Sequence, residues 1–129
     1  MSLQTTARAF SAESDVLSEI RRFVGAEVDR LTFSPFVYEL QLAVTEACAN
    51  SIVHTETDEI RVSITPVGSC LEIRVEDDGI YRRRIPAPEA DGQGHRGLHL
   101  MAAMVDEFSL QRGTERRPGT VVRLVKCKR

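Results

Sequence analysis

Leu42-Ala-Val-Thr-Glu-Ala-Cys-Ala-Asn-Ser-Ile-Val-His54 is the stretch of sequence that decides the fold of this chain. It places Glu46, Asn50 and His54 four residues apart, and residues at that spacing lie on one face of a helix. The other positions are mostly small and apolar. Because burying a polar group costs free energy unless something pairs with it, we expect this polar stripe to border a cavity. The stretch therefore predicts a helix over 35–54 with one functional face.

The composition is that of an ordinary globular protein. The chain has 129 residues, of which 42% are hydrophobic and 28% charged, so we expect one domain spanning 1–129 with a substantial core. The net charge of −2 argues against broad electrostatic binding to nucleic acid or to a membrane surface. We find neither an apolar run of about 18 residues nor the apolar segment of a secretory signal, so we expect no membrane span and no secretion.

The three cysteines predict a reducing compartment. Cys48, Cys70 and Cys127 lie far apart and form no Cys-x-x-Cys pair. This pattern favours reduced thiols over a disulfide framework or a metal site, and it indicates a cytoplasmic protein.

Hydrophobic periodicity predicts the other elements and their order. Apolar residues at helical spacing favour a helix over 13–30, and Ser34-Pro35 is a typical start for the next helix. The remaining expected segments are an edge strand at 3–10, a hairpin with strands at 60–64 and 71–75, an irregular loop at 80–95, a helix at 97–105, and strands at 108–110 and 120–125. This order predicts an α+β sandwich, with the helices on one face of a mixed, mostly antiparallel sheet.

Three further motifs follow the polar stripe. They are, in chain order, Asp77-x-Gly79, Gly94-His95-Arg96-Gly97-Leu98 and Gly119-Thr120. Together with the stripe, they resemble the GHKL superfamily, whose ATP-binding fold is shared by gyrase B, histidine kinases and MutL. Within that superfamily, this short single-domain chain looks like the anti-sigma factor serine kinases. The resemblance spans nearly the whole chain and implies the two-layer Bergerat ATP-binding fold.

Asn50 and Glu46 suit the phosphate end of an ATP site. An amide oxygen is a hard ligand for Mg²⁺, which takes few protein ligands and completes its shell with phosphate oxygens and waters. Glu46, one turn away, can orient or deprotonate the hydroxyl that attacks the γ-phosphate. The resemblance implies the same roles, with Asn50 as the metal ligand and Glu46 as the general base. The alternative is that both belong to a solvated helix face.

His54 has two equally good interpretations. In the resembled family a histidine often ends this motif, near the phosphates. A histidine at a helix C-terminus also interacts favourably with the helix dipole and needs no ligand for that.

Asp77 is the purine-reading residue that the resemblance implies. A carboxylate only accepts hydrogen bonds, and adenine offers an exocyclic amino group where guanine offers an oxygen. Gly79 would let the backbone approach the base closely. The alternative is that Asp77-Asp-Gly79 is only a turn. Thr120 resembles the threonine of the family's final hairpin beside the adenine pocket, and it also suits the start of a strand.

The glycine-rich segment is the predicted phosphate contact. Gly94, His95, Arg96, Gly97 and Leu98 lead into a helix start, whose exposed N–H groups and positive dipole end favour phosphate. The pattern Gly-x-Gly-x-x-Gly over 92–97 lacks the preceding strand of a dinucleotide-binding unit, and no Gly-Lys-Ser/Thr marks a P-loop. Three arginines at 82–84 fall where this superfamily has its ATP lid, and they can pair with phosphate or stay solvated.

The resemblance implies a cytoplasmic anti-sigma factor that is also a serine-protein kinase. Such a protein binds ATP and Mg²⁺, sequesters a sigma factor, and phosphorylates a serine of an anti-sigma factor antagonist. It also implies a homodimer, with no direct contact to nucleic acid or membrane. Two alternatives stay open: a non-catalytic, ATP-gated interaction module, and a detached catalytic domain of a histidine kinase.

Overall fold

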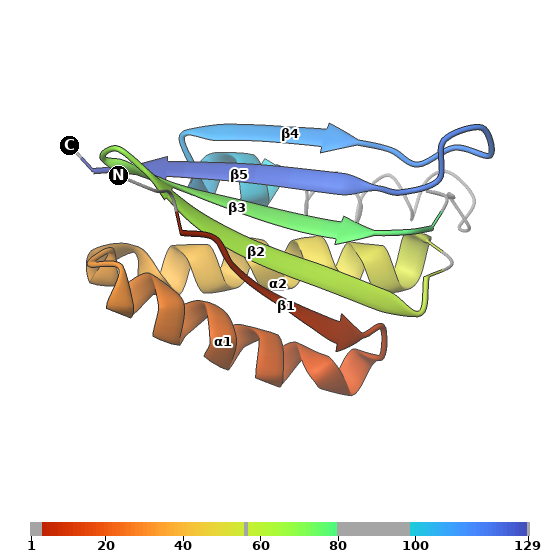
Figure 1. Ribbon diagram of the computed structural model, residues 1–129, viewed down its shortest axis with the longest axis horizontal. Coiled ribbons are helices and arrows are strands. Elements are labelled where there is room, and N and C mark those ends of the chain that lie inside the picture. The colour runs from red at the N-terminus through yellow and green to blue at the C-terminus, as the bar shows by residue number, and fades with distance from the viewer. Residues whose placement is uncertain (1–3, 56, 80–98, 129) are drawn as a thin grey trace.

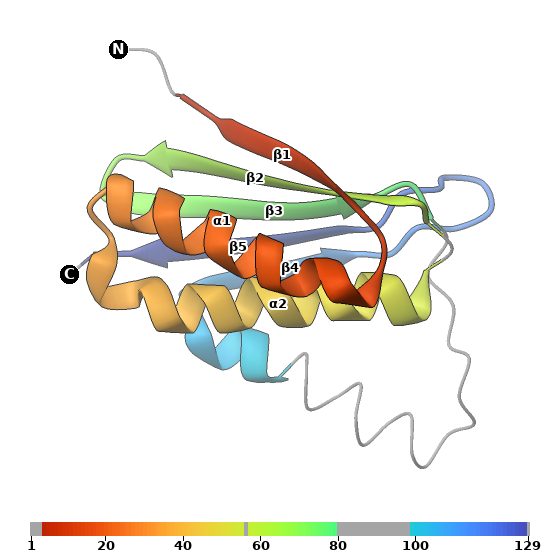
Figure 2. The same cartoon turned by 90° about the horizontal axis from the view of Figure 1, so that it is seen from below.

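The protein forms two layers, a twisted five-stranded sheet with helices covering one of its faces (Figures 1 and 2). This computed structural model describes residues 4–55, 57–79 and 99–128, apart from the side chain of His54. The α+β sandwich predicted from the sequence is confirmed. Within the described ranges, no helix is both long enough and apolar enough to cross a membrane.

Every described strand pairing in the sheet is antiparallel. The strands are β1 (Thr6–Ser11), β2 (Glu59–Val67), β3 (Cys70–Asp77), β4 (Glu107–Gln111) and β5 (Val121–Cys127), in the spatial order β1-β2-β3-β5-β4. The expected parallel component of a mixed sheet is therefore missing from these pairings. Since β5 is antiparallel to both β3 and β4, those two strands run in the same direction. They form no parallel pair because β5 lies between them.

Two long helices cover the sheet, and each begins with a short 3-10 turn. The first is α1 (Leu17–Arg30) after η1 (Ser14–Val16), and the second is α2 (Val37–His54) after η2 (Ser34–Phe36). Pro35 occupies the start of η2 as predicted, but the hydroxyl of Ser34 does not cap the helix. It donates to the Asp29 carboxylate at the end of α1 instead. The serine thus ties the two helices together where they turn.

The core lies between the helices and one face of the sheet. Apolar residues of α1 and α2 recur at helical spacing, and those of the central strands alternate, so each element buries a single face. Fully buried members include Ile20, Val24, Val28, Leu40, Val44, Ile60, Val62, Ile64, Leu71, Ile73 and Leu124. Each such side chain stabilises the fold by about 1.5–3 kcal/mol.

The other face of the sheet is polar and carries ion pairs. Arg61 contacts Asp78 at 3.1 Å, and Arg123 contacts Glu72 at 2.7 Å. Such an alternation of buried and solvated faces is typical of antiparallel sheets with helices on one side. The helices therefore mark the side on which a buried site can form.

The cysteine prediction is wrong for two of the three cysteines. Cys70 and Cys127 stand directly opposite each other on β3 and β5 and form a disulfide. They are 57 residues apart in sequence, and only the register of the two strands brings them together. Cys48 is free and buried, as expected of a reduced thiol. The described residues contain no group of His, Cys, Asp and Glu side chains that could hold a metal ion.

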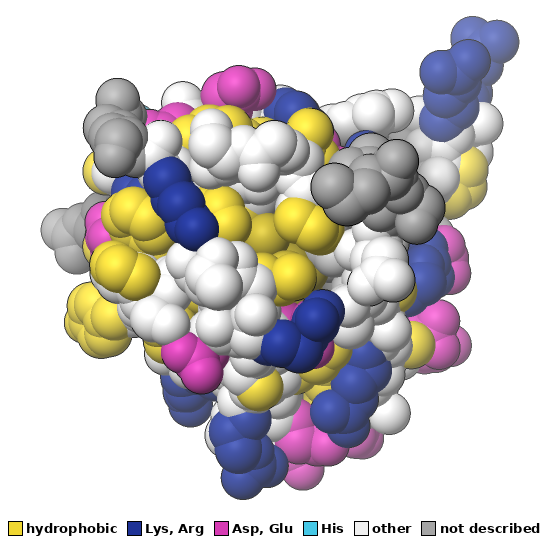
Figure 3. Space-filling view, turned by 60° about the vertical axis from the view of Figure 1, so that its left-hand side comes forward, with side chains coloured by type: hydrophobic (Ala, Val, Ile, Leu, Met, Phe, Trp, Pro, Cys, Tyr) yellow, Lys and Arg dark blue, Asp and Glu magenta, His cyan; other side chains and the backbone are white. Residues whose placement is uncertain are grey.

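The disulfide lies at the end of the sheet where the helices turn from α1 to α2. Figure 3 shows this end from outside, with hydrophobic side chains gathered in its centre and basic side chains among and below them. Lys126 lies near the end of β5 and Lys128 directly follows that strand. Their ammonium groups lie over the rings of Phe36 and Phe33, at 4.9 and 4.6 Å from the ring centroids. We call this region the disulfide end. The opposite end of β3 carries Asp77.

Candidate functional site

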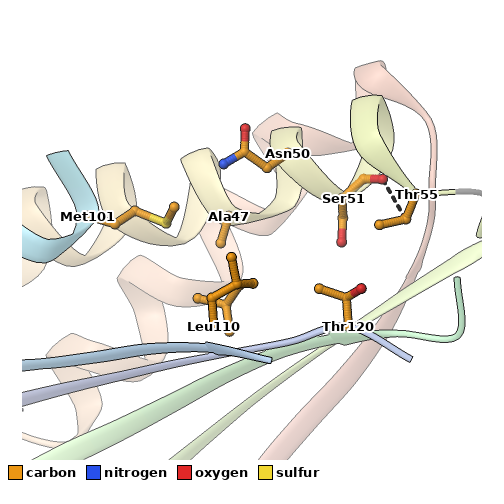
Figure 4. A pocket seen from close by; sticks show the side chains of 8 residues that line it. Ala47, Asn50, Ser51, Thr55, Met101, Leu110 and Thr120 are labelled. Atoms are coloured by element: carbon orange, nitrogen blue, oxygen red, sulfur yellow. Dashed lines mark hydrogen bonds between the residues drawn. The ribbon is translucent and has the colours of Figure 1, made fainter. Parts of the chain in front are cut away.

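A pocket opens between the second half of α2 and the far end of the sheet (Figure 4). About 280 Å³ of space lies among its lining residues, and part of that space is open to solvent. Its lining residues are Ala47, Asn50, Ser51, Thr55, Met101, Leu110, Thr120 and Val122. An apolar pocket with a few polar groups that converge on it is the usual form of a small-molecule site.

Asp77 lies just beneath this pocket as the last residue of β3, and it is only 2% exposed. Its Oδ2 accepts a hydrogen bond from the hydroxyl of Ser51, and the hydroxyl of Thr55 lies 3.4 Å away, with a shorter hydrogen bond of 2.6 Å to the carbonyl of Ser51. Its Oδ1 accepts from the N–H of Gly79 at 2.9 Å and from the N–H of Thr120 at 3.4 Å. A buried carboxylate is costly unless its oxygens are satisfied, and here each of its two oxygens accepts at least one hydrogen bond. Asp77, the residue predicted to contact the purine, is therefore a buried hydrogen-bond acceptor rather than an exposed turn residue.

Backbone contacts hold the strands around Asp77 in place. Its own N–H donates to the carbonyl of Thr120 at 3.0 Å, and the carbonyl of Gly79 accepts from the N–H of Gly119 at 2.9 Å. Gly119 has a φ of +113°, a conformation that favours glycine. A Cβ on Gly113 would meet the carbonyl oxygen of Gly79 and lie 2.7 Å from the nitrogen of Gly119. These glycines let three backbone segments meet under the pocket.

Glu46 and Asn50 lie one turn apart on α2, both half-buried. Asn50 lines the pocket and projects away from the sheet, whereas Ala47 and Ser51 on the neighbouring face point towards it (Figure 4). Among the residues that the structure describes, none forms a hydrogen bond or ion pair with either side chain. Within this part of the chain, both side chains are therefore available to contact a ligand. A single amide oxygen beside a pocket fits Mg²⁺, which takes most of its ligands from phosphate and water.

The structure does not describe the side chains of the other residues predicted to contact phosphate. His54 is the last residue of α2, and its side chain is not described. Gly94, His95, Arg96, Gly97 and Leu98, together with the arginines at 82–84, lie outside the described residues. The helix predicted for 97–105 is present over 99–104, where Met101 is buried against the pocket.

Thr120 lines the pocket and is only 4% exposed. Its hydroxyl oxygen accepts a hydrogen bond from the N–H of Gly113 at 2.9 Å. This contact leaves the hydroxyl proton of Thr120 available as a donor.

Ser51 and Thr55 are site residues that sequence reasoning missed. With Ala47 they form a second stripe of small side chains four residues apart, next to the Glu46 stripe and facing the sheet. That spacing is visible in the sequence and could have identified them. What the sequence did not reveal is their partner, because Asp77 is 26 residues from Ser51 along the chain.

Cys48 is a free thiol on α2, three residues before Ser51, and it is fully buried. Burial and the negative charge of Asp77 raise the pKa of the Cys48 thiol to about 12. The nucleophilic form of a cysteine is the thiolate, so Cys48 has no reactive role near neutral pH.

Comparisons with known proteins identify the family of the domain and similar folds. The family model described as histidine kinase-like ATPase domain matches residues 10–126. Among solved structures, the chain is similar to the Acinetobacter baumannii histidine kinase AdeS, with a TM-score of 0.54 and 8% identity over 96% of this chain and 68% of that one. At that identity the likeness concerns the fold. No curated protein matches the sequence.

Proposed function

The chain belongs to the histidine kinase-like ATPase family, and on this premise we propose that it binds Mg²⁺-ATP and transfers the γ-phosphate to a serine of a partner protein. The observation that carries the proposal is Asp77, a satisfied carboxylate buried against a pocket at the position where the family reads adenine. Membership of the family implies ATP binding. The choice of acceptor is our inference.

The base end of the ATP would enter between α2 and the strands. Leu110, Val122 and Met101 offer apolar contact to a flat ring. Asp77 and the hydroxyl groups around it offer acceptors to the exocyclic amino group. Guanine would place an oxygen against the same acceptors, so the pocket favours ATP over GTP.

The phosphate end would lie along the other stripe of α2. Asn50 would hold Mg²⁺ through its amide oxygen, and the ion when bound would neutralise charge on the phosphate oxygens. Asn50 lines the same pocket as Ser51 and Thr120, the neighbours of Asp77, so one ligand can extend from Asn50 to the residues around Asp77.

Glu46 is the proposed general base. It lies one turn before Asn50 on the same helix face, half-buried, with its carboxylate available to accept the proton of an incoming hydroxyl. Positioning this hydroxyl for in-line attack is most of what phosphoryl transfer asks of the protein.

The proposed biological role is that of an anti-sigma factor in a partner-switching system. It rests on the resemblance of the motifs to the anti-sigma factor serine kinases. By that resemblance the chain would form a homodimer in the cytoplasm, bind a sigma factor, and phosphorylate the antagonist that releases it.

The decisive experiment is incubation of the full chain with Mg²⁺ and ATP labelled at the γ-phosphate, together with candidate antagonist proteins. We expect label on a serine of the antagonist, in a linkage that survives acid. Acid-labile label on a histidine would instead identify a catalytic domain of the histidine kinase type. ATP binding without transfer to any protein would favour a non-catalytic, ATP-gated module.

Glu46→Gln separates binding from transfer in the same assay. We expect this variant to keep ATP affinity within about twofold and to lose transfer by about a hundredfold or more, because a positioned base contributes roughly 10²–10⁴-fold. Glu39→Gln is a matched control, since Glu39 lies on the same helix but contacts Lys126 at 3.7 Å near the disulfide end. Wild-type transfer by the Glu46 variant would remove the general-base role.

A further inference from the structure

We propose that Ser51 is a second base-reading residue, whose hydroxyl oxygen accepts a hydrogen bond from the exocyclic amino group of adenine alongside Asp77. This inference rests on the proposed ATP-binding function and deepens it. It assigns to Ser51 a share of the purine specificity that Asp77 would otherwise have alone.

The direction of the Ser51 hydroxyl is fixed by its partner. The hydroxyl lies within hydrogen-bond distance of Oδ2 of Asp77. A carboxylate only accepts, so Ser51 must donate its one proton to Asp77. What remains on the Ser51 oxygen is its lone pairs. Towards a ligand in the pocket, Ser51 is therefore an acceptor and not a donor.

The position of Ser51 puts this acceptor in front of the ligand. Ser51 lines the pocket and points from α2 towards the sheet, on the side of Thr120 (Figure 4). Asp77 is 2% exposed and does not line the pocket, because Ser51 and Thr55 cover its Oδ2. An amino group that enters the pocket meets the serine oxygen on its way to the carboxylate.

Thr55 holds Ser51 in this orientation. The Thr55 hydroxyl donates to the carbonyl of Ser51 at 2.6 Å, and it lies at a longer 3.4 Å from Asp77. Since one hydroxyl has one proton, the shorter contact takes it. Ser51 is then the main side-chain donor to Oδ2 of Asp77, and Thr55 is a positioning residue that acts through Ser51.

Thr120 supplies the complementary group. Its oxygen already accepts from the N–H of Gly113, so its proton is available for a ring nitrogen. An acceptor at Ser51 and a donor at Thr120 match the amino group and the neighbouring ring nitrogen of adenine. Guanine carries an oxygen and an N–H at those two places, so both contacts would be reversed.

The test compares ATP with the 5′-triphosphate of purine riboside, which lacks only the amino group. Calorimetric titration of the full chain in Mg²⁺ gives the ratio of the two dissociation constants for wild type and variants. We expect wild type to prefer ATP, and Ser51→Ala to reduce that preference by about fivefold to tenfold, as befits one hydrogen bond. Thr45→Ala is the matched control, because the Thr45 hydroxyl on the same helix donates to the carbonyl of Gln41 at 2.6 Å.

The ratio separates base reading from a merely structural role. If Ser51→Ala weakens both ligands equally and keeps the wild-type ratio, Ser51 only supports the fold and the inference is overturned. Ser51→Thr keeps the hydroxyl and should retain the wild-type preference for ATP within about twofold. This variant tests the inference even if the alanine variant does not fold. Loss of the preference in Ser51→Thr would also overturn the inference. A wild-type chain that binds neither ligand would overturn the proposed function together with this inference. A wild type that binds both ligands equally well would leave ATP binding standing but would overturn the reading of the amino group.

Discussion

The two ends of β3 are held in opposite ways. At one end Asp77 is surrounded by hydroxyl and backbone donors under a pocket, and at the other Cys70 is bonded covalently to Cys127. The site end contains a buried charge, which stabilises a fold little at best. The disulfide end adds a cross-link and aromatic rings covered by lysines. The comparison indicates that the covalent cross-link and the proposed ligand site lie at different ends of the same strands.

Removing the disulfide should give the largest loss of stability. A cross-link between residues 57 apart constrains the unfolded chain, and its loss costs about 4 kcal/mol by loop entropy alone. We expect Cys70→Ser to lower the free energy of unfolding in urea by about 2–4 kcal/mol, with little change in ATP affinity at temperatures where the variant is folded. Equal stability of the oxidised chain and the variant would show that the disulfide end does not have this role.

Two glycine substitutions compare the ends directly. Gly113→Ala should cost about 3 kcal/mol, because its Cβ would meet backbone atoms of Gly79 and Gly119 that have little room to move. Gly68→Ala, in the turn between β2 and β3, should cost only about 1 kcal/mol, since its φ is +59° but nothing lies within 4 Å of the added carbon. Urea unfolding measures both values. A larger loss for Gly68→Ala would reverse the assignment of tight packing to the site end.

The smallest effect concerns Cys48. Its thiol pKa of about 12 lies above the usual 9.0, so the folded state binds the proton more tightly. The corresponding contribution to stability is complete below about pH 9 and falls as the pH rises towards 12. At pH 8 we expect iodoacetamide to leave Cys48 unmodified in the folded chain and to label it in urea, as mass spectrometry can show. Rapid labelling of the folded chain would mean that the site end opens readily.

The sequence predicted most of the fold and part of the site, for reasons that the residues make clear. The 3.6-residue spacing in α2 identified the helix and its Glu46 stripe, and alternation identified β2 and β3 up to Asp77. These signals are local. The Ser51 contact with Asp77 and the Cys70–Cys127 bond depend on which strands lie side by side and in what register, and the linear spacing of the residues does not contain that information.

Contacts between neighbouring elements of the fold also explain two smaller differences from the prediction, at the start of the second helix and in the pairing of the strands. Ser34 is a suitable helix cap by sequence, but its hydroxyl donates a hydrogen bond to the nearby Asp29 carboxylate instead. β3 and β4 run in the same direction but do not pair, because β5 lies between them, which the order of elements along the chain did not indicate.

The central claim is that the pocket above Asp77 reads adenine, and titration of the full chain with ATP and GTP in the presence of Mg²⁺ tests it most directly. We predict saturable ATP binding that is at least about tenfold tighter than GTP binding, since reversed hydrogen bonds leave buried groups unpaired. Asp77→Asn should remove most of this preference, because its amide offers a donor where the carboxylate accepts. Equal affinity of the wild-type chain for ATP and GTP would contradict the account.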